Sequence, residues 1–462
     1  MKMIKSMIGQ AFWALAVGST IWGTPACAAH PKVQTFNWDG TEVVWVEDAR
    51  FPTFVASIYF DYGAAAENPA QRGITAWALS EITDGTKQYT QKELASNLEY
   101  YGIGHTSNVN QEFALFNFWG AVKFLPQTVA QICHLFKAAN YPAQELANTK
   151  KKAKRDLNNM ATNPSAVVNQ MVEIFWGQGT PWANPVGGRW ATFQKFKGPN
   201  LQNHLQFLRE KVKKKIYISG PSEVLAAQEY FKACGFKGDQ TWNFASATPV
   251  APAAAGKPQI TFVALPQSNQ AQIMLGGWRG PIAVPDLAAA DLANSFLGGH
   301  NFKTQLMQEI RVKHGLTYGI YSYVNFGRHF SQVLIETSGR TEKVGEILQR
   351  TIQKLNELQE GVILPEELAL TRTGFAREKI FDQETAVRYL RSLVIMEYLG
   401  GKITDLENYA EQIKKVERPQ VVEFFKQAYG PQLQIAVVGH PSLKKELAKI
   451  GTVREVKLKD LW

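Results

Sequence analysis

The sequence lacks both a metal-binding cluster and, beyond its N-terminus, a long hydrophobic run. No two of its eight histidines are three or four residues apart, and none flanks a pair of cysteines, so no independent metal signature is present. After residue 28 no apolar stretch is long enough to span a bilayer, which predicts no transmembrane anchor. Low-complexity tracts are also absent. The 462 residues, 45% of them hydrophobic, therefore predict a folded chain of two or more domains.

The first 28 residues have the pattern of a secretory signal peptide. Lys2 and Lys5 precede an apolar run over residues 7–22, and the small-residue triplet Ala26-Cys27-Ala28 follows. A positive start, an apolar core and an A-x-A site predict cleavage after residue 28. A lipoprotein anchored at Cys27 is an alternative with a poor motif. We expect an exported protein located in a bacterial periplasm.

Removal of the signal peptide leaves Cys133 and Cys234. An oxidising compartment permits a disulfide between them. Both cysteines lie in apolar helical patterns, which favours two buried free thiols instead. The sequence alone leaves this choice open.

Positive charge exceeds negative charge by +10, or +8 without Lys2 and Lys5 of the signal peptide. The basic residues are scattered, with clusters at residues 150–155 and 211–215. We interpret both clusters as solvated helix faces. No nucleic-acid partner is expected for an exported protein.

The chain after the signal peptide reads as a duplication. A Pro/Ala-rich linker at residues 245–258 separates a domain at residues 29–244 from one at residues 259–462. Each half ends with a β-rich run, a glycine break and a helical pattern. The two break glycines, Gly220 and Gly439, are 219 residues apart, which gives the length of the repeat.

The halves also begin alike, with strand patterns at residues 54–63 and 271–280 and helices at residues 73–83 and 286–297. In the second half, strands at residues 316–324 and 330–337 and a helix at residues 341–358 follow. The pattern predicts an α+β fold: two tandem domains, each a mainly antiparallel sheet covered by helices on one side, enclosing a cleft.

The segment "GITAWALSEITDGT" (residues 73–86) resembles the zinc-binding helix of the M16 (pitrilysin/insulinase) metallopeptidase family, in its two-domain form. In that family an H-x-x-E-H motif binds zinc and activates a water. Here Ala76, Leu79 and Ser80 occupy the motif positions, and none is expected to bind the metal. The family's third ligand, a glutamate, aligns with Asp156, which an alternative interpretation makes an ordinary surface aspartate. The resemblance implies a helix kept as architecture, with an apolar stripe that includes Trp77 near the lost metal site.

The second half contains "NFKTQLMQEIRVKHGLTYGIYSY" (residues 301–323), which resembles the family's C-terminal-domain signature. The resemblance implies that Arg311 holds substrate backbone and that Tyr318 supports the oxyanion of a partner's zinc site. Gly315 suits the left-handed end of the helix, and Leu316, Tyr318 and Ile320 alternate as in a strand. The structural alternative is a basic helix end beside a strand tyrosine.

Together these features imply a non-catalytic, zinc-free subunit of an exported M16-type peptidase. It would form a heterodimer with an H-x-x-E-H subunit, which would hold the zinc, and supply Arg311 and Tyr318 in trans. Unfolded peptide would add a strand to a sheet edge. Residues 108–122 are the candidate for that edge, and an ordinary core strand pair is at least as good an interpretation of any single residue in them. The alternative is a peptide-binding or scaffold pseudoenzyme without a role in catalysis. A self-sufficient peptidase would require zinc in the chain alone.

Overall fold

The computed structural model describes residues 30–242, 257–299, 301–430 and 433–461. The predicted signal peptide, with Cys27, lies outside the described residues, and so does all of the predicted linker except its last two residues. Residues 31–462 form one compact unit. Within the described ranges, no helix combines the length and the apolar character needed to cross a membrane.

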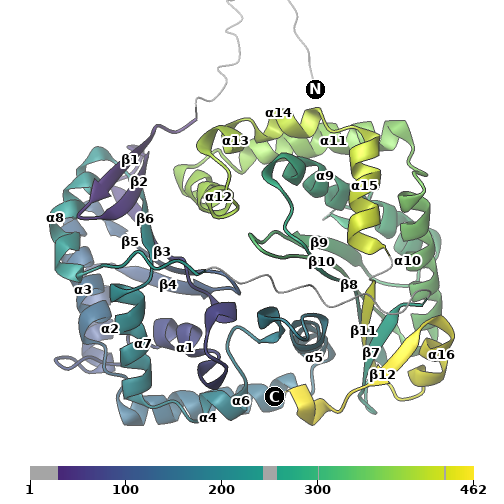
Figure 1. The fold of residues 1–462 in the computed structure, drawn as a ribbon, viewed down its shortest axis with the longest axis horizontal. Coiled ribbons are helices and arrows are strands. Elements are labelled where there is room, and N and C mark those ends of the chain that lie inside the picture. Colours follow the sequence, from purple (N-terminus) through teal and green to yellow (C-terminus); the bar gives the residue numbers. More distant parts are fainter. Residues whose placement is uncertain (1–29, 243–256, 300, 431–432, 462) are drawn as a thin grey trace, which may run out of the picture. The chain divides into compact units, whose positions relative to one another are not determined.

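The first half of the chain builds a six-stranded sheet in the order β1-β2-β6-β3-β5-β4 (Figure 1). Only the β2–β6 pair is parallel, so the sheet is mainly antiparallel. The strands are β1 (Val33–Trp38), β2 (Thr41–Glu47), β3 (Thr53–Phe60), β4 (Gly104–Val109), β5 (Ala114–Ala121) and β6 (Lys214–Gly220).

The second half builds a sheet in the order β12-β7-β11-β8-β10-β9. Apart from the outer strands β1 and β12, the two orders correspond strand for strand, which confirms the duplication. Gly220 and Gly439 end the equivalent strands β6 and β11. The strands are β7 (Gln259–Ala264), β8 (Gln270–Arg279), β9 (Ile320–Asn325), β10 (Ser331–Arg340), β11 (Gln434–Gly439) and β12 (Thr452–Glu455).

Amphipathic helices cover one face of each sheet. In α3, Leu125, Val129, Ile132 and Phe136 recur every three or four residues and are buried, because such spacing places them on one face of the helix. On the first sheet lie α1 (Ile74–Ser80), α2 (Gln91–Tyr100), α3 (Leu125–Ala138), α7 (Gly198–Glu210) and α8 (Ala227–Phe231). On the second lie α9 (Leu287–Gly298), α10 (Val344–Gln359) and α15 (Arg418–Tyr429).

The opposite face of each sheet is covered by a helix from the other half of the chain. Helix α12 (Ala386–Tyr398) packs on β2 and β6 of the first sheet, whereas α5 (Pro164–Met171) packs on β8 and β11 of the second. The predicted one-sided covering was therefore incomplete. Periodicity within α5 or α12 reports that the helix is apolar, but it does not report which sheet it will contact.

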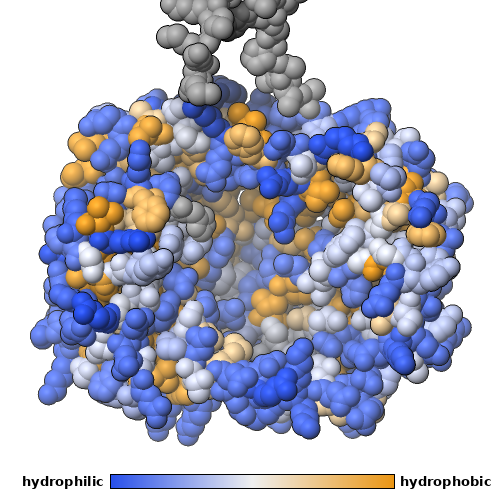
Figure 2. All heavy atoms as spheres, turned by 180° about the vertical axis from the view of Figure 1, so that it is seen from behind, coloured by the Kyte–Doolittle hydropathy of each residue, from blue (hydrophilic) through white to orange (hydrophobic). Residues whose placement is uncertain are grey.

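Polar contacts also join the halves. Glu397 at the end of α12 accepts hydrogen bonds from Lys215 Nζ (2.5 Å) and Tyr217 Oη (2.7 Å) of β6. Arg328 pairs with Asp61, Nη1 to Oδ1, at 2.9 Å. Such partly buried pairs orient two surfaces more than they add net stability. Seen from behind in Figure 2, the surface is hollowed near its centre, and apolar side chains gather there beside polar ones.

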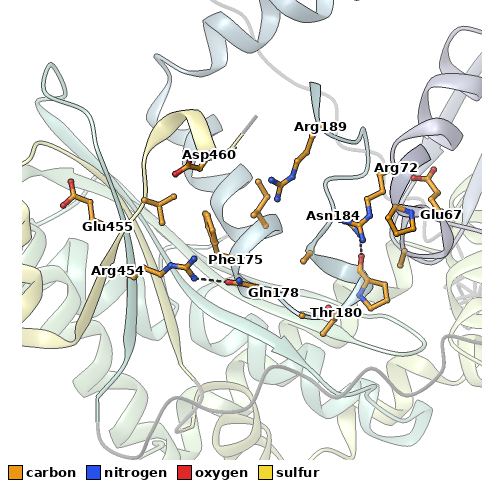
Figure 3. A pocket seen from close by; sticks show the side chains of 17 residues that line it. Glu67, Arg72, Phe175, Gln178, Thr180, Asn184, Arg189, Arg454, Glu455 and Asp460 are labelled. Carbon is orange, nitrogen blue, oxygen red and sulfur yellow. Dashed lines mark hydrogen bonds between the residues drawn. The ribbon is translucent and has the colours of Figure 1, made fainter. Parts of the chain in front are cut away.

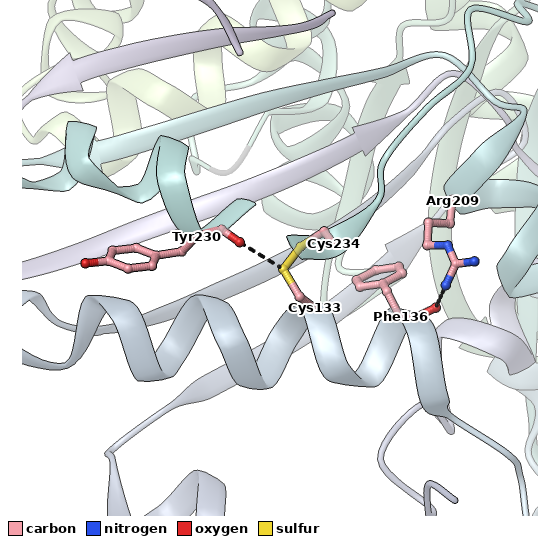
Figure 4. Close-up of a disulfide and its surroundings, with 5 residues drawn as sticks. All are labelled: Cys133, Phe136, Arg209, Tyr230 and Cys234. Carbon is pink, nitrogen blue, oxygen red and sulfur yellow. Dashed lines mark hydrogen bonds between the residues drawn. A yellow bond between two sulfur atoms is a disulfide. The ribbon is translucent and has the colours of Figure 1, made fainter. Parts of the chain in front are cut away.

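Cys133 and Cys234 form a disulfide, so the expectation of two free thiols was wrong (Figure 4). Cys133 lies in α3, and Cys234 lies just after α8, which packs beside it. The two Cα atoms are 4.3 Å apart although 101 residues separate them in the sequence. The apolar patterns correctly indicated burial. They could not indicate that the two buried positions face each other.

Candidate functional site

The helix that resembles the zinc-binding helix is α1, and its key positions carry no metal ligand. Leu79 is buried, Ala76 is half-buried, and Ser80 is exposed with its Oγ donating to Glu81 Oε1 at 2.9 Å. Glu81 also accepts from Thr149 Oγ1 at 3.2 Å. Among the described residues, no group of three or more histidine, cysteine, aspartate or glutamate side chains could hold a metal ion. The residues around α1 therefore do not fit a zinc ion.

The start of α1 is firmly held. The Glu67 carboxylate accepts the backbone N–H groups of Gly73 (2.5 Å) and Thr75 (2.8 Å), which satisfies donors that a helix leaves free at its N-terminus. Burial raises the pKa of Glu67 to about 7 despite these bonds. Thr75 Oγ1 lies 2.9 Å from Nε2 of buried His204, whose pKa is lowered to about 3 by burial. Helix α1 is thus anchored as a structural element.

The side chain of Trp77 projects from α1 against aromatic residues. Its ring stacks on Phe193 with centroids 3.6 Å apart and planes 10° from parallel, and its Nε1 donates to Gly187 O at 2.8 Å. Trp77 lines a cavity of about 320 Å³ together with Asp156 of α4 (Ala143–Met160). The structure therefore brings α1 and the Asp156 position to one cavity, although neither Arg311 nor Tyr318 belongs to its lining.

Two acidic residues of this cavity differ in their surroundings. Asp156 is half exposed and lies 3.9 Å from Arg155 Nε, as an ordinary surface aspartate would. Glu173, in a π-helix at Val172–Trp176, is mostly buried, and burial raises its pKa to about 7. Sequence reasoning missed Glu173, because a single glutamate in an apolar helical run carries no signal of its own.

We expect Glu173→Gln to stabilise the protein at high pH but not at low pH. The pKa of Glu173 is raised above its usual 4.5 in the folded state, so the unfolded chain loses this proton first. Folding stability contributed by this group falls as pH rises from about 4.5 to about 7. Glutamine does not ionise and therefore avoids that loss, so we expect the unfolding free energy at pH 8 to rise by about 2 kcal/mol. Urea unfolding at pH 4.5 and pH 8 measures it.

Glu99→Gln, at an exposed position of α2, is the matched control and should change stability little at either pH. If Glu173→Gln gave the same change in unfolding free energy at both pH values, burial of the Glu173 charge would not be the cause.

Arg311 and Tyr318 lie together. Arg311 is in a π-helix at Met307–Lys313, and Gly315 after it has a φ of +59°, which confirms the predicted left-handed residue. The Arg311 guanidinium carbon lies 4.8 Å from the centroid of the Tyr318 ring. Tyr318 is 84% exposed. The strand β9 begins only at Ile320, so Tyr318 precedes it and is not a strand residue as predicted.

A third residue completes this arrangement. The ring centroid of Phe302 lies 4.7 Å from the Arg311 guanidinium carbon, so two aromatic rings are within cation–π distance of the cation. Contacts of this kind restrict a guanidinium group without using its N–H donors. Phe302 was missed because it lies in an irregular segment nine positions before Arg311, where no periodicity applies. Arg311 and the Tyr318 phenol can donate together to a carbonyl or an oxyanion.

Strand β4 is one of the two edge strands of the first sheet, and β1 is the other. Strand β5 pairs with both β3 and β4, so most of the predicted edge at residues 108–122 is internal. The alternative of a core strand pair holds for β5, and the edge interpretation was wrong there, because the sequence pattern does not report the order of the strands in the sheet. The residues of β4 are half-buried or exposed, so this edge strand can accept an added strand.

The duplicated sheets, the anchored α1 and the exposed Arg311–Tyr318 pair define a protein with the architecture of a zinc peptidase and without its metal ligands. The chain belongs to the M16 family. Residues 42–188 match the family model described as "Insulinase (Peptidase family M16)", and residues 215–375 match that of the "Peptidase M16 inactive domain".

Relatives of similar length share this architecture. The chain is 22% identical to the "Non-peptidase homolog YmxG" of Helicobacter pylori, over 85% of this chain and 90% of that protein. A peptidase M16 inactive domain from Pseudomonas fluorescens has a TM-score of 0.77 at 21% identity, covering 88% of this chain and 98% of the other. A protease from H. pylori has a TM-score of 0.78 at 14% identity, covering 89% and 100%. At these identities the two structures establish the fold alone.

Proposed function

We propose that this chain is the non-catalytic subunit of an exported M16-type zinc peptidase. It would complete the active site of an H-x-x-E-H subunit by supplying Arg311 and Tyr318. The observation that carries the proposal is the combination of an exposed, stacked Arg311–Tyr318 pair with Ala76, Leu79 and Ser80 at the metal-ligand positions.

The chemistry of the pair suits this role. A phenol and a guanidinium donate hydrogen bonds that strengthen as negative charge develops on a carbonyl oxygen during attack by a zinc-bound water. The zinc and the general base would both come from the partner. The open edge of β4 would hold an unfolded peptide by main-chain hydrogen bonds, in a register that tolerates varied side chains.

Export to an oxidising compartment is part of the proposal. The N-terminal pattern of residues 1–28 supports it. The Cys133–Cys234 disulfide supports it as well, because disulfides are rare in reducing cytoplasm. A bacterial periplasm fits both features.

A test is to titrate this chain into a purified H-x-x-E-H subunit of the same family and measure cleavage of an unfolded peptide. We expect cleavage to rise and to saturate at one copy of this chain per partner. The same titration with heat-denatured chain is the control. A complex that forms without any gain in cleavage would contradict the proposal.

That outcome would favour the second candidate, a peptide-binding or scaffold pseudoenzyme. The observation that favours it is the similarity to an H. pylori relative named as a non-peptidase homolog. The two candidates differ in one respect: a scaffold needs the surface of this chain, whereas a subunit that completes an active site needs the Tyr318 hydroxyl.

A further inference from the structure

Three arginines from separate parts of the chain line one pocket of about 710 Å³ (Figure 3). Arg72 precedes α1, Arg189 immediately precedes α6 (Trp190–Phe193), and Arg454 belongs to β12. The pocket is large enough for the end of a peptide or a small ligand.

Only one of these arginines has its donors occupied. Arg454 Nη1 donates to Gln178 Oε1 at 2.9 Å, and its guanidinium lies 5.1 Å from the centroid of the Phe175 ring. Across the described part of the chain, the guanidinium groups of Arg72 and Arg189 have neither a hydrogen bond nor an ion pair. Arg72 Nε is buried without an acceptor. A buried donor without a partner costs stability, so an acceptor from outside the chain would satisfy it.

Among the described residues, the carboxylates of the pocket form no ion pair with Arg72 or Arg189, and the attraction of Glu67 for Arg72 does not outweigh burial in setting the pKa of Arg72. Glu67 binds the backbone at the start of α1, and Glu455 pairs with Lys444 at 2.6 Å. Asp460 forms no ion pair with either arginine. Arg72 and Arg189 instead repel each other, and burial together with this repulsion lowers the pKa of Arg72.

The backbone segments that carry Arg72 and Arg189 are in tight contact. Gly188 has a φ of +72°, and a Cβ at this position would lie 2.2 Å from Arg72 O. Because Arg189 follows Gly188 directly, this contact fixes the segment that carries Arg189 beside the segment that carries Arg72. Two guanidinium groups on neighbouring segments offer the donor pattern that carboxylates accept in bidentate fashion.

We infer that Arg72 and Arg189 form a binding site for a carboxylate of a peptide substrate. The site lies at the start of α1, in the half of the chain to which we assign peptide binding. The inference rests on the proposed function and deepens it by naming a substrate class: peptides that place an acidic side chain or their own C-terminal carboxylate in this pocket.

Binding of three fluorescent peptides, measured by anisotropy, tests the inference on the purified full chain. The first peptide has no acidic side chain and a free C-terminus, the second is its C-terminal amide, and the third is the amide with one glutamate added. We expect the amide to bind about tenfold more weakly than at least one of the other two, because it lacks the carboxylate. Which of the two binds tightly identifies the source of the carboxylate.

Arg72→Gln and Arg189→Gln should each abolish that difference between peptides. Arg340→Gln, at an exposed arginine paired with Glu342 at the end of β10, should preserve it. If the unmodified chain bound the three peptides equally, or bound none of them, the inference would be overturned without relying on any variant. The binding measurement uses this chain alone, whereas cleavage requires the H-x-x-E-H partner, so the cleavage assay tests the proposed function separately.

Discussion

We expect Tyr318→Phe to lower the kcat of the assembled peptidase about 10²–10³-fold, the loss typical of one missing oxyanion donor. The change removes a single hydroxyl from a side chain that is 84% exposed, so we expect the stability of the fold to change little. The phenyl ring still stacks on Arg311. The measurement is steady-state cleavage of an unfolded peptide by the H-x-x-E-H subunit saturated with each form of this chain.

KM should change much less than kcat, because the hydroxyl acts on charge that develops during the reaction. Tyr100→Phe is the matched control: it is a tyrosine of α2 with 77% of its surface exposed, and its loss should leave cleavage unchanged. Full stimulation by Tyr318→Phe would exclude a catalytic role for the phenol.

We expect the double variant Cys133→Ser, Cys234→Ser to lose about 3–5 kcal/mol of unfolding free energy. The disulfide closes a loop across 101 positions of the sequence, and cross-links that close long loops restrict the unfolded chain most. It also ties α3 to the segment after α8, two parts of the helical layer on the first sheet. Guanidinium-induced unfolding, followed by circular dichroism, measures the difference.

A reducing agent provides the control for this experiment. It should destabilise the unmodified protein by a similar amount and leave the double variant unaffected. Equal stability of the oxidised protein and the double variant would mean that the helices hold α3 and α8 together without help from the bond.

Much of the fold could be predicted because it depends on local patterns. The repeat between Gly220 and Gly439 was visible as two strand–glycine–helix patterns, and both glycines end equivalent strands. Strands β3 and β8 agreed with the predictions to within a few residues. The predictions that failed concern contacts between residues that are far apart in the sequence. The pairing of Cys133 with Cys234 is set by how elements pack, which no single periodicity reports.

The same division holds for the candidate site. Arg311 and Tyr318 were identified because the segment that carries both resembles the family's C-terminal-domain signature, and the structure places them side by side. Phe302 joins them from an irregular segment. Arg72 and Arg189 line one pocket, and their segments come together at the backbone contact of Gly188. Sequence reasoning identifies residues that a single motif unites, whereas sites assembled by tertiary contact require the structure.

The exchange of α5 and α12 between the halves has a consequence for how the protein is made. The first sheet has all its strands once Gly220 has been synthesised, but the helix that covers its second face ends at Tyr398. At typical rates of synthesis this interval lasts about 10–35 s. During it an apolar sheet surface has no cover within its own half, while α5 has no sheet to cover. Because each half buries a sheet face with a helix from the other, we expect the two duplicated halves to fold as one cooperative unit.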